Sequence, residues 1–170
     1  CMHNANLNSC SFLCRAKHPT KVHIWAGISY QGPTQICIFD GIMAAPLYIH
    51  ILDQTLLPFI ANVMPDGHRF MADNDPKHTS KLAQEYLKEK KVNWWRTPAE
   101  SPDLNPIENM WHELKEFMRR EVKPKTKQEL IDGIISFWET VTIEKCRKYI
   151  GHLRKVIPRV LEVDGAATGY

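Results

Sequence analysis

Residues 68–95, HRFMADNDPKHTSKLAQEYLKEKKVNWW, hold the pattern that decides the fold. A β-rich run over His68–Ala72 is followed by helical spacing over Thr79–Lys91 and then by a second β-rich run over Val92–Trp95. Two strands joined through a helix lie parallel in one sheet. The unit therefore predicts an α/β domain with a ligand site at the carboxyl ends of its strands. The apolar face of the helix is predicted to hold Leu82, Ala83, Tyr86 and Leu87.

The sequence before this unit predicts a β-hairpin and a helix. Val22–Ser29 and Thr34–Asp40 are rich in β-branched and aromatic residues, and a Gln-Gly-Pro turn separates them. Pro46–Ile60 has mostly helical spacing of apolar residues, with prolines near its start and its end. Residues 1–20 show no clear period and are predicted to form an irregular leader. The whole pattern predicts a mixed sheet flanked by helices.

After the second strand, three prolines make Thr97–Pro106 a constrained loop, and a helix follows. Asn105 suits the N-cap of this helix, Pro106 its first turn, and Glu108 its third position. Six apolar residues then recur at helical spacing and should be buried. They are Ile107, Met110, Trp111, Leu114, Phe117 and Met118.

Two more helices are predicted near the end of the chain. Thr126 and Glu129 have the spacing of a capping box before Leu130–Glu139. Thr142 opens a last helix, because apolar residues recur after it at helical spacing. These residues are Cys146, Ile150, Leu153, Ile157 and Leu161.

Composition limits the class of protein. A chain of 170 residues suits one domain, and 44% hydrophobic with 24% charged residues excludes wholesale disorder. No stretch approaches the ~20 consecutive apolar residues of a membrane helix, so no membrane partner is expected. Five cysteines, an odd number, favour reduced thiols and an intracellular protein. A zinc site at Cys10 and Cys14 with nearby histidines is disfavoured, because the paired spacing of structural zinc ligands is missing.

Charge is distributed unevenly along the chain. Residues 1–39 contain three Lys or Arg residues and no Asp or Glu, so the whole net charge of +3 lies in this segment. A second basic run surrounds the end of the helix that begins near Pro106. It is either a solvated helix end or a set of phosphate contacts. Its members are Lys115, Arg119, Arg120, Lys123, Lys125 and Lys127.

Two carboxylates occupy positions where chemistry is expected. Asp73 ends the third predicted strand, and Glu108 lies in the first turn of the helix after the fourth. Because that helix begins near the same edge of the sheet, both side chains can converge on one site. Hard carboxylate oxygens suit Mg²⁺, and two such ions can clamp the reacting oxygens of a phosphodiester. The structural alternatives are a turn residue for Asp73 and a capping group for Glu108.

The sequence motifs around both carboxylates resemble those of one protein family. Residues 73–80, DNDPKHTS, resemble the second-aspartate motif of mariner-superfamily DNA transposases, and residues 101–109, SPDLNPIEN, resemble their third motif. Thirty-four residues lie between Asp73 and Glu108, a spacing that this family uses. The segments HIWAGIS and FDGIM and the ending over 165–170 are also similar to the family, so the resemblance spans roughly residues 17–170.

The resemblance implies an RNase H-like fold with a DDE metal site that holds two Mg²⁺ or Mn²⁺ ions. Asp73 and Glu108 map to catalytic, metal-binding positions. Lys77, His78 and Asn109 become secondary candidates near the site for nucleic-acid contact, and the basic run adds Lys115 and Arg119. The resemblance also implies action in the nucleus. Strand cleavage at transposon ends is followed there by attack of a DNA 3′ hydroxyl on target DNA, with a homodimer or a full-length transposase as a possible partner.

One departure from the family matters. Its first catalytic Asp lies on an opening strand upstream of the hairpin, and residues 1–39 contain no acidic residue. Residues 21–170 are therefore expected to form a partial catalytic domain that lacks its opening strand. Weak or absent activity and marginal stability are expected of it. A remnant that only binds nucleic acid or dimerises is the alternative, and an RNase H-like nuclease with a differently completed site is the last hypothesis.

Overall fold

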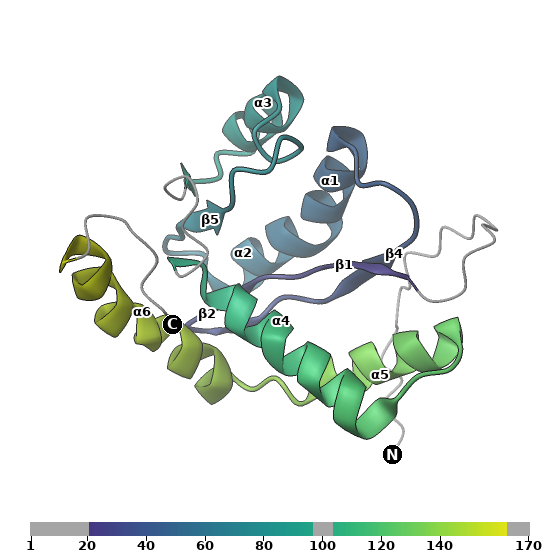
Figure 1. The fold of residues 1–170 in the computed structure, drawn as a ribbon. Helices are drawn as coiled ribbons and strands as arrows, with labels where there is room; N and C mark the ends of the chain where they lie inside the picture. The colour runs from purple at the N-terminus through teal and green to yellow at the C-terminus, as the bar shows by residue number, and fades with distance from the viewer. Residues whose placement is uncertain (1–20, 97–103, 163–170) are drawn as a thin grey trace, which may run out of the picture.

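The computed structural model describes residues 21–96 and 104–162, with side chains up to residue 158. The leader predicted over 1–20, most of the loop over 97–106 and the ending over 165–170 lie outside the described residues. Figure 1 shows strands between two groups of helices. The strands are β1 (His23–Trp25), β2 (Ile28–Ser29), β3 (Gly32–Pro33), β4 (Cys37–Phe39), β5 (Phe70–Ala72) and β6 (Trp94–Arg96). The helices are α1 (Ala45–Ile51), η1 (Leu52–Leu56), α2 (Leu57–Val63), α3 (Lys81–Glu89), α4 (Pro106–Phe117), η3 (Met118–Val122), α5 (Lys127–Glu139) and α6 (Ile143–Glu162).

The predicted hairpin is confirmed, with a shift of register inside it. β1 pairs antiparallel with β4, and β2 with β3. Three residues separate β3 from β4 and only two separate β1 from β2, so the β3–β4 side carries one extra residue, as in a β-bulge. At this point Thr34 N–H donates to the Gly27 carbonyl at 2.9 Å, and Gly27 N–H donates to Thr34 Oγ1 at 2.8 Å. The threonine hydroxyl thus replaces a main-chain acceptor.

The turn of the hairpin lies one position earlier than expected. Tyr30 and Gln31 form it, while Gly32 and Pro33 are already in β3. Gly32 has φ of +128°, and a Cβ there would lie 3.4 Å from Ile143 of α6. Backbone conformation and the approach of α6 both favour glycine at this position.

β5 and β6 are parallel, as the strand–helix–strand unit predicted, with Phe70 opposite Trp94 and Ala72 opposite Arg96. The expected single mixed sheet is not formed by the described strands, which make three separate two-stranded pairs. Among the described strands, β1 pairs with β4, β2 with β3, and β5 with β6, so each has one strand partner.

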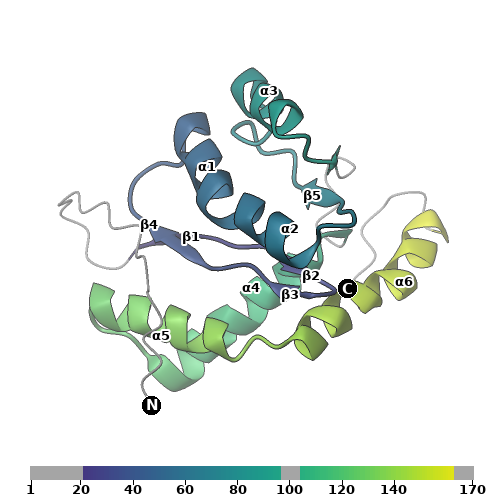
Figure 2. The same ribbon diagram turned by 180° about the vertical axis from the view of Figure 1, so that it is seen from behind.

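The hairpin lies between two hydrophobic cores, because alternate side chains of a strand point to opposite faces. Figures 1 and 2 show α1, α2 and α3 on one side of β1 and β4, and α4, α5 and α6 on the other. One core joins Trp25, Cys37, Phe39, Tyr48, Ile51, Leu52, Leu56, Ala83, Leu87 and Val92. The second joins Ala26, Met110, Leu114, Met118, Ile134, Phe137, Trp138, Val141 and Cys146, with Ile24 and Ile38 packed against it.

The helix predicted over 46–60 is confirmed as a continuous run over 45–63 with a π-helical segment, η1, in its middle. Pro58 lies just after this segment and has no N–H to bond the preceding turn, which accounts for the local change of hydrogen bonding. Tyr48 is fully buried in this run. The spacing of Tyr48, Ile51, Leu52 and Thr55 identifies the face that packs.

The later helices match their predicted ends more closely than their predicted faces. The capping box of Thr126 and Glu129 is present, and Met110, Leu114 and Met118 are buried as expected. Leu82 and Ile157 were predicted to be buried and are about half exposed. Val156 takes the buried position in α6, because the face that meets the core lies one residue earlier.

Two further predictions are tested by the described residues. Cys37 and Cys146 are buried, and neither forms a disulfide within this part of the chain. Among the helices that the structure describes, we find none with the length and apolar character needed to cross a membrane.

Candidate active site

Asp73 directly follows β5, at the carboxyl end of the parallel pair. Its Oδ1 contacts His78 Nδ1 at 2.5 Å and accepts the Asp75 N–H at 3.2 Å. The side chain is 54% exposed, so a metal ion or a phosphate can reach it from solvent. The bond from the Asp75 N–H is the one expected of a turn residue, and the same carboxylate remains accessible to a metal ion.

The segment after Asp73 forms a tight turn that Asp75 organises. The Asp75 carboxylate accepts the Lys77 N–H at 3.0 Å and forms an ion pair with Lys77 Nζ. Burial disfavours the charge on Asp75, but the hydrogen bonds and charge of Lys77 outweigh it and hold the pKa of Asp75 below its ordinary value. The N-cap of α3 is Ser80, whose hydroxyl accepts the Ala83 N–H at 3.2 Å. Asp75 thus shapes the turn rather than capping the helix, and Lys77 is held by Asp75.

His78 connects Asp73 to the core. Its side chain is only 12% exposed, and its ring lies 4.4 Å from that of Tyr48, centre to centre, at 35°. Burial, with a smaller contribution from the charge of Asp73, raises the pKa of Tyr48 above its ordinary value. The Tyr48 hydroxyl and His78 Nε2 are both buried and have no hydrogen-bond partner among the described residues. Sequence reasoning missed Tyr48, because only the 3.6-residue spacing with Ile51 and Leu52 pointed to it.

Glu108 is the third residue of α4 and is exposed. Its N–H donates to the Asn105 carbonyl at 3.1 Å, but the Asn105 side chain makes no capping bond. No side-chain capping bond forms at this helix start, but Glu108 lies in the first turn, where the helix dipole favours a negative charge. Its carboxylate makes no ion pair within the described residues. Asn109 is exposed beside it. In both ribbon views α4 begins next to the β5–β6 pair (Figures 1 and 2), which places the two carboxylate-bearing segments in the same region.

The donor set fits Mg²⁺ or Mn²⁺, because Asp73 and Glu108 supply hard, accessible oxygens and His78 supports Asp73 from behind. Within residues 21–96 and 104–162, no group of three or more His, Cys, Asp or Glu side chains is close enough to hold a metal. Among the described residues, Asp73 and Glu108 are therefore candidate ligands without a third metal-binding side chain grouped with them.

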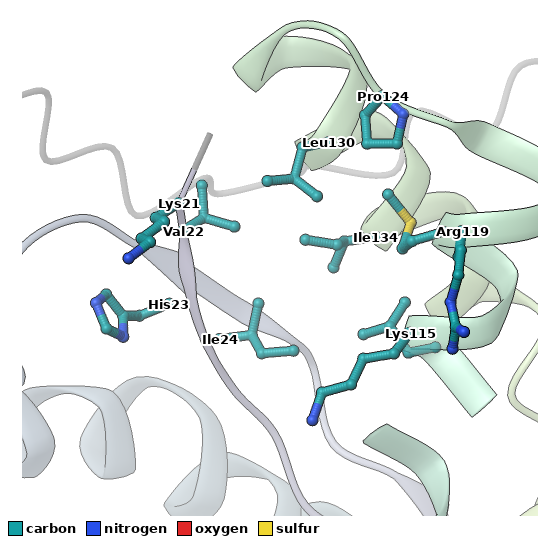
Figure 3. A pocket seen from close by; sticks show the side chains of 11 residues that line it. Lys21, Val22, His23, Ile24, Lys115, Arg119, Pro124, Leu130 and Ile134 are labelled. Carbon is teal, nitrogen blue, oxygen red and sulfur yellow. The ribbon is translucent and has the colours of Figure 1, made fainter. Parts of the chain in front are cut away.

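Lys115 and Arg119 lie elsewhere. They are seven and eleven residues after Glu108, or about 10 and 16 Å further along the helix axis at 1.5 Å per residue. Both line a cavity beside β1, shown in Figure 3, and Arg119 forms an ion pair with Glu116. The structure thus gathers Asp73, Lys77 and His78 at one place and these two cations at another.

Comparisons with known proteins agree with this arrangement. A family model described as DDE superfamily endonuclease matches residues 9–131. The Tcb2 transposase of Caenorhabditis briggsae is 28% identical over 149 residues, which are 88% of this chain and 54% of that protein. The Tc1 transposase of Caenorhabditis elegans is 26% identical over the same length and shares. The chain spans about half the length of these relatives.

The fold is that of a solved transposase domain. The catalytic domain of Mos1 transposase superposes with a TM-score of 0.77 at 17% identity, over 87% of this chain and 78% of that one. At this identity the likeness shows the fold, and it confirms the predicted RNase H-like class. Because the family model covers well over half of the sequence, the chain belongs to the DDE superfamily of endonucleases.

Proposed function

We propose that this chain is the catalytic region of a transposase that cleaves DNA strands and joins them to target DNA, using Mg²⁺ or Mn²⁺. The observation that carries the proposal is the accessible Asp73 carboxylate, which His78 orients at the end of β5. Family membership supports the reaction class. The Mos1 catalytic domain has been solved with Mn and with Mg, which supports the choice of metal.

In this proposal Asp73 and Glu108 bind the metal through carboxylate oxygens. Bound divalent ions would activate the attacking oxygen and stabilise the leaving oxygen of a phosphodiester. His78 holds Asp73 in one rotamer through the Nδ1 contact, so less side-chain freedom is lost when the ion binds. Asn109, one residue after Glu108, is exposed, and in this proposal it would donate a hydrogen bond to a phosphate oxygen.

The two carboxylates alone would hold a pair of metal ions weakly. DDE chemistry implies a third acidic ligand, and the family resemblance assigns no counterpart for it among residues 1–39. We expect the 170-residue chain by itself to cleave DNA slowly or not at all. A third carboxylate supplied by further sequence or by another copy would raise the activity.

The proposed partners are transposon-end and target DNA, with a homodimer or a full-length transposase as the working assembly in the nucleus. A Mos1 transposase has been solved in a paired-end complex with the left transposon end, which supports DNA ends as the substrate. Strong nonspecific binding is not expected of this chain, because its Lys and Arg residues outnumber its Asp and Glu residues by only three.

The test measures metal binding and DNA cleavage separately. Isothermal titration of the 170-residue chain with Mn²⁺ should show binding that Asp73→Asn and Glu108→Gln each weaken by about tenfold or more. The matched controls, Asp66→Asn in an exposed turn and Glu121→Gln, should leave it unchanged. Unaltered Mn²⁺ affinity in both site variants would refute the assignment. Nicking of supercoiled plasmid in Mn²⁺, tested on the same proteins, reports any residual cleavage.

A second candidate is a module that binds nucleic acid or dimerises without cleaving. The absence of a three-ligand metal group among the described residues favours it. Salt-dependent binding of a DNA duplex, with no nicking in Mn²⁺ and no Mn²⁺ affinity, would support this candidate over the first.

A further inference from the structure

The imidazole of His78 is bonded at one of its two nitrogens. Nδ1 contacts Asp73 Oδ1 at 2.5 Å, which leaves Nε2 as the other hydrogen-bonding atom of the ring. Histidines around metal sites normally bond through both nitrogens, and the second bond fixes the ring. Nε2 of His78 is buried and has no hydrogen-bond partner among the described residues. Hydrogen bonds alone therefore do not fix the orientation of this ring.

The backbone of His78 is fixed, but the backbone does not set the ring either. The His78 N–H donates to the Asp75 carbonyl at 2.9 Å, and the Ser80 hydroxyl donates to the Lys77 carbonyl at 3.1 Å. These bonds hold the main chain of the turn after β5. The torsion that turns an imidazole about its Cβ–Cγ bond is broad, so the ring can still rotate. Another contact must select the orientation in which Nδ1 meets Asp73.

That contact is the ring of Tyr48 on α1. The ring centres of Tyr48 and His78 lie 4.4 Å apart with 35° between the planes, which is as close as aromatic rings pack. The His78 side chain is 12% exposed and Tyr48 is fully buried, so neither ring has room to move away. The separation is too short for an edge-to-face pair, so the imidazole cannot turn its edge toward Tyr48 without displacing it.

Tyr48 is itself held in place from both sides of the turn. It belongs to the core in which Ala83 and Leu87 of α3 are also buried. Figures 1 and 2 show α1 beside α3, and the Tyr86 hydroxyl on α3 donates to the Asp53 carboxylate on η1 at 2.7 Å. Since α3 begins directly after the turn that follows β5, these contacts fix α1 relative to that turn.

We infer, on the basis of the proposed metal-binding role of Asp73, that Tyr48 is a positioning residue of this site. Its ring fixes the orientation of the His78 imidazole, and the imidazole fixes the Asp73 carboxylate. The orientation selected is that of an imidazole that carries its proton on Nδ1 and donates it to Asp73. Tyr48 acts only through His78, so its ring is required and its hydroxyl is dispensable.

The experiment measures the Mn²⁺ affinity of the 170-residue chain by isothermal titration in two variants of Tyr48. Tyr48→Phe keeps the ring and should bind Mn²⁺ as the wild type does. Tyr48→Met fills the space with a flexible chain and should bind about fivefold more weakly, as expected for the loss of one aromatic contact. Phe137→Met, the same kind of change at a buried residue of the second core, is the matched control and should leave the affinity unchanged.

A double-variant cycle shows whether Tyr48 acts through His78. In the His78→Ala background, Tyr48→Met should weaken Mn²⁺ binding by less than about twofold, because the group that Tyr48 positions is gone. An equal loss of affinity in both backgrounds would overturn the inference. So would a Tyr48→Met variant that is folded and binds Mn²⁺ as tightly as the wild type.

The ¹⁵N spectrum of the imidazoles gives a readout that needs no metal. At about pH 8, wild type and Tyr48→Phe should show His78 mainly protonated on Nδ1, and Tyr48→Met should show a larger share protonated on Nε2. The His78 ring protons of the wild type should also resonate upfield, because they lie over the Tyr48 ring. If either wild-type feature were missing, the inference would fail even where Tyr48→Met does not fold. A wild-type chain that has both features and binds no Mn²⁺ would refute the proposed function while supporting the positioning role of Tyr48.

Discussion

Replacing Tyr48 by phenylalanine should stabilise the protein, although most buried Tyr→Phe changes do the opposite. Tyr48 is fully buried and its hydroxyl has no hydrogen-bond partner among the described residues. A buried hydroxyl without a partner costs about 1–3 kcal/mol of desolvation that Phe avoids. Phe keeps the ring that lies 4.4 Å from His78, so the packing is retained. We expect a gain of about 1 kcal/mol in the free energy of unfolding, because relaxation around the site recovers part of that penalty.

Tyr149→Phe is the matched control. The Tyr149 hydroxyl donates to the Glu113 carboxylate, and removing a hydrogen bond to a charged group costs about 1.5–3 kcal/mol, or less where solvent has access. The two Tyr→Phe changes should therefore have opposite signs.

Urea unfolding followed by circular dichroism measures both free energies. The slope of the unfolding free energy against urea should match the wild type in each variant, since neither change alters the surface exposed on unfolding. In thermal melts, Tyr48→Phe should raise Tm by about 2–4 °C, as expected for 1 kcal/mol in a domain of this size. A lower stability of Tyr48→Phe would refute the reasoning and would show that the hydroxyl has a partner next to His78.

Three further changes test other contacts. His78→Ala should weaken Mn²⁺ binding about tenfold while Asp73 remains, whereas unchanged affinity would mean that His78 does not position the ligand. Trp138→Phe should lower the free energy of unfolding by about 1–3 kcal/mol, because it removes the 2.9 Å bond from the indole N–H to the buried Thr34 carbonyl; urea unfolding checks this value. Burial opposes the charge on Glu113, but the bond and charge of Lys145 hold its pKa below the ordinary 4.5. Its stabilisation is present above that value and is lost as pH falls through the lower folded pKa. Glu113→Gln should therefore be less stable than wild type at pH 7, and the difference should shrink in urea melts as pH falls through that lowered pKa.

The sequence by itself determined the local elements of this protein. The parallel β5–β6 unit, the hairpin and the capping box at Thr126 follow from short-range rules of spacing, turn chemistry and capping. The two acidic motifs, residues 73–80 and 101–109, could also be recognised in the sequence, because runs of consecutive residues there resemble motifs of one catalytic family.

The tertiary structure alone decided how these elements meet. It placed Tyr48 behind His78 and left Leu82 exposed, since burial depends on which neighbouring helix covers each face. It separated Lys115 and Arg119 from Asp73 and put them in a cavity beside β1. It also left the described strands in three pairs, because long-range strand pairing requires a partner from a distant part of a chain, and no local pattern specifies that partner.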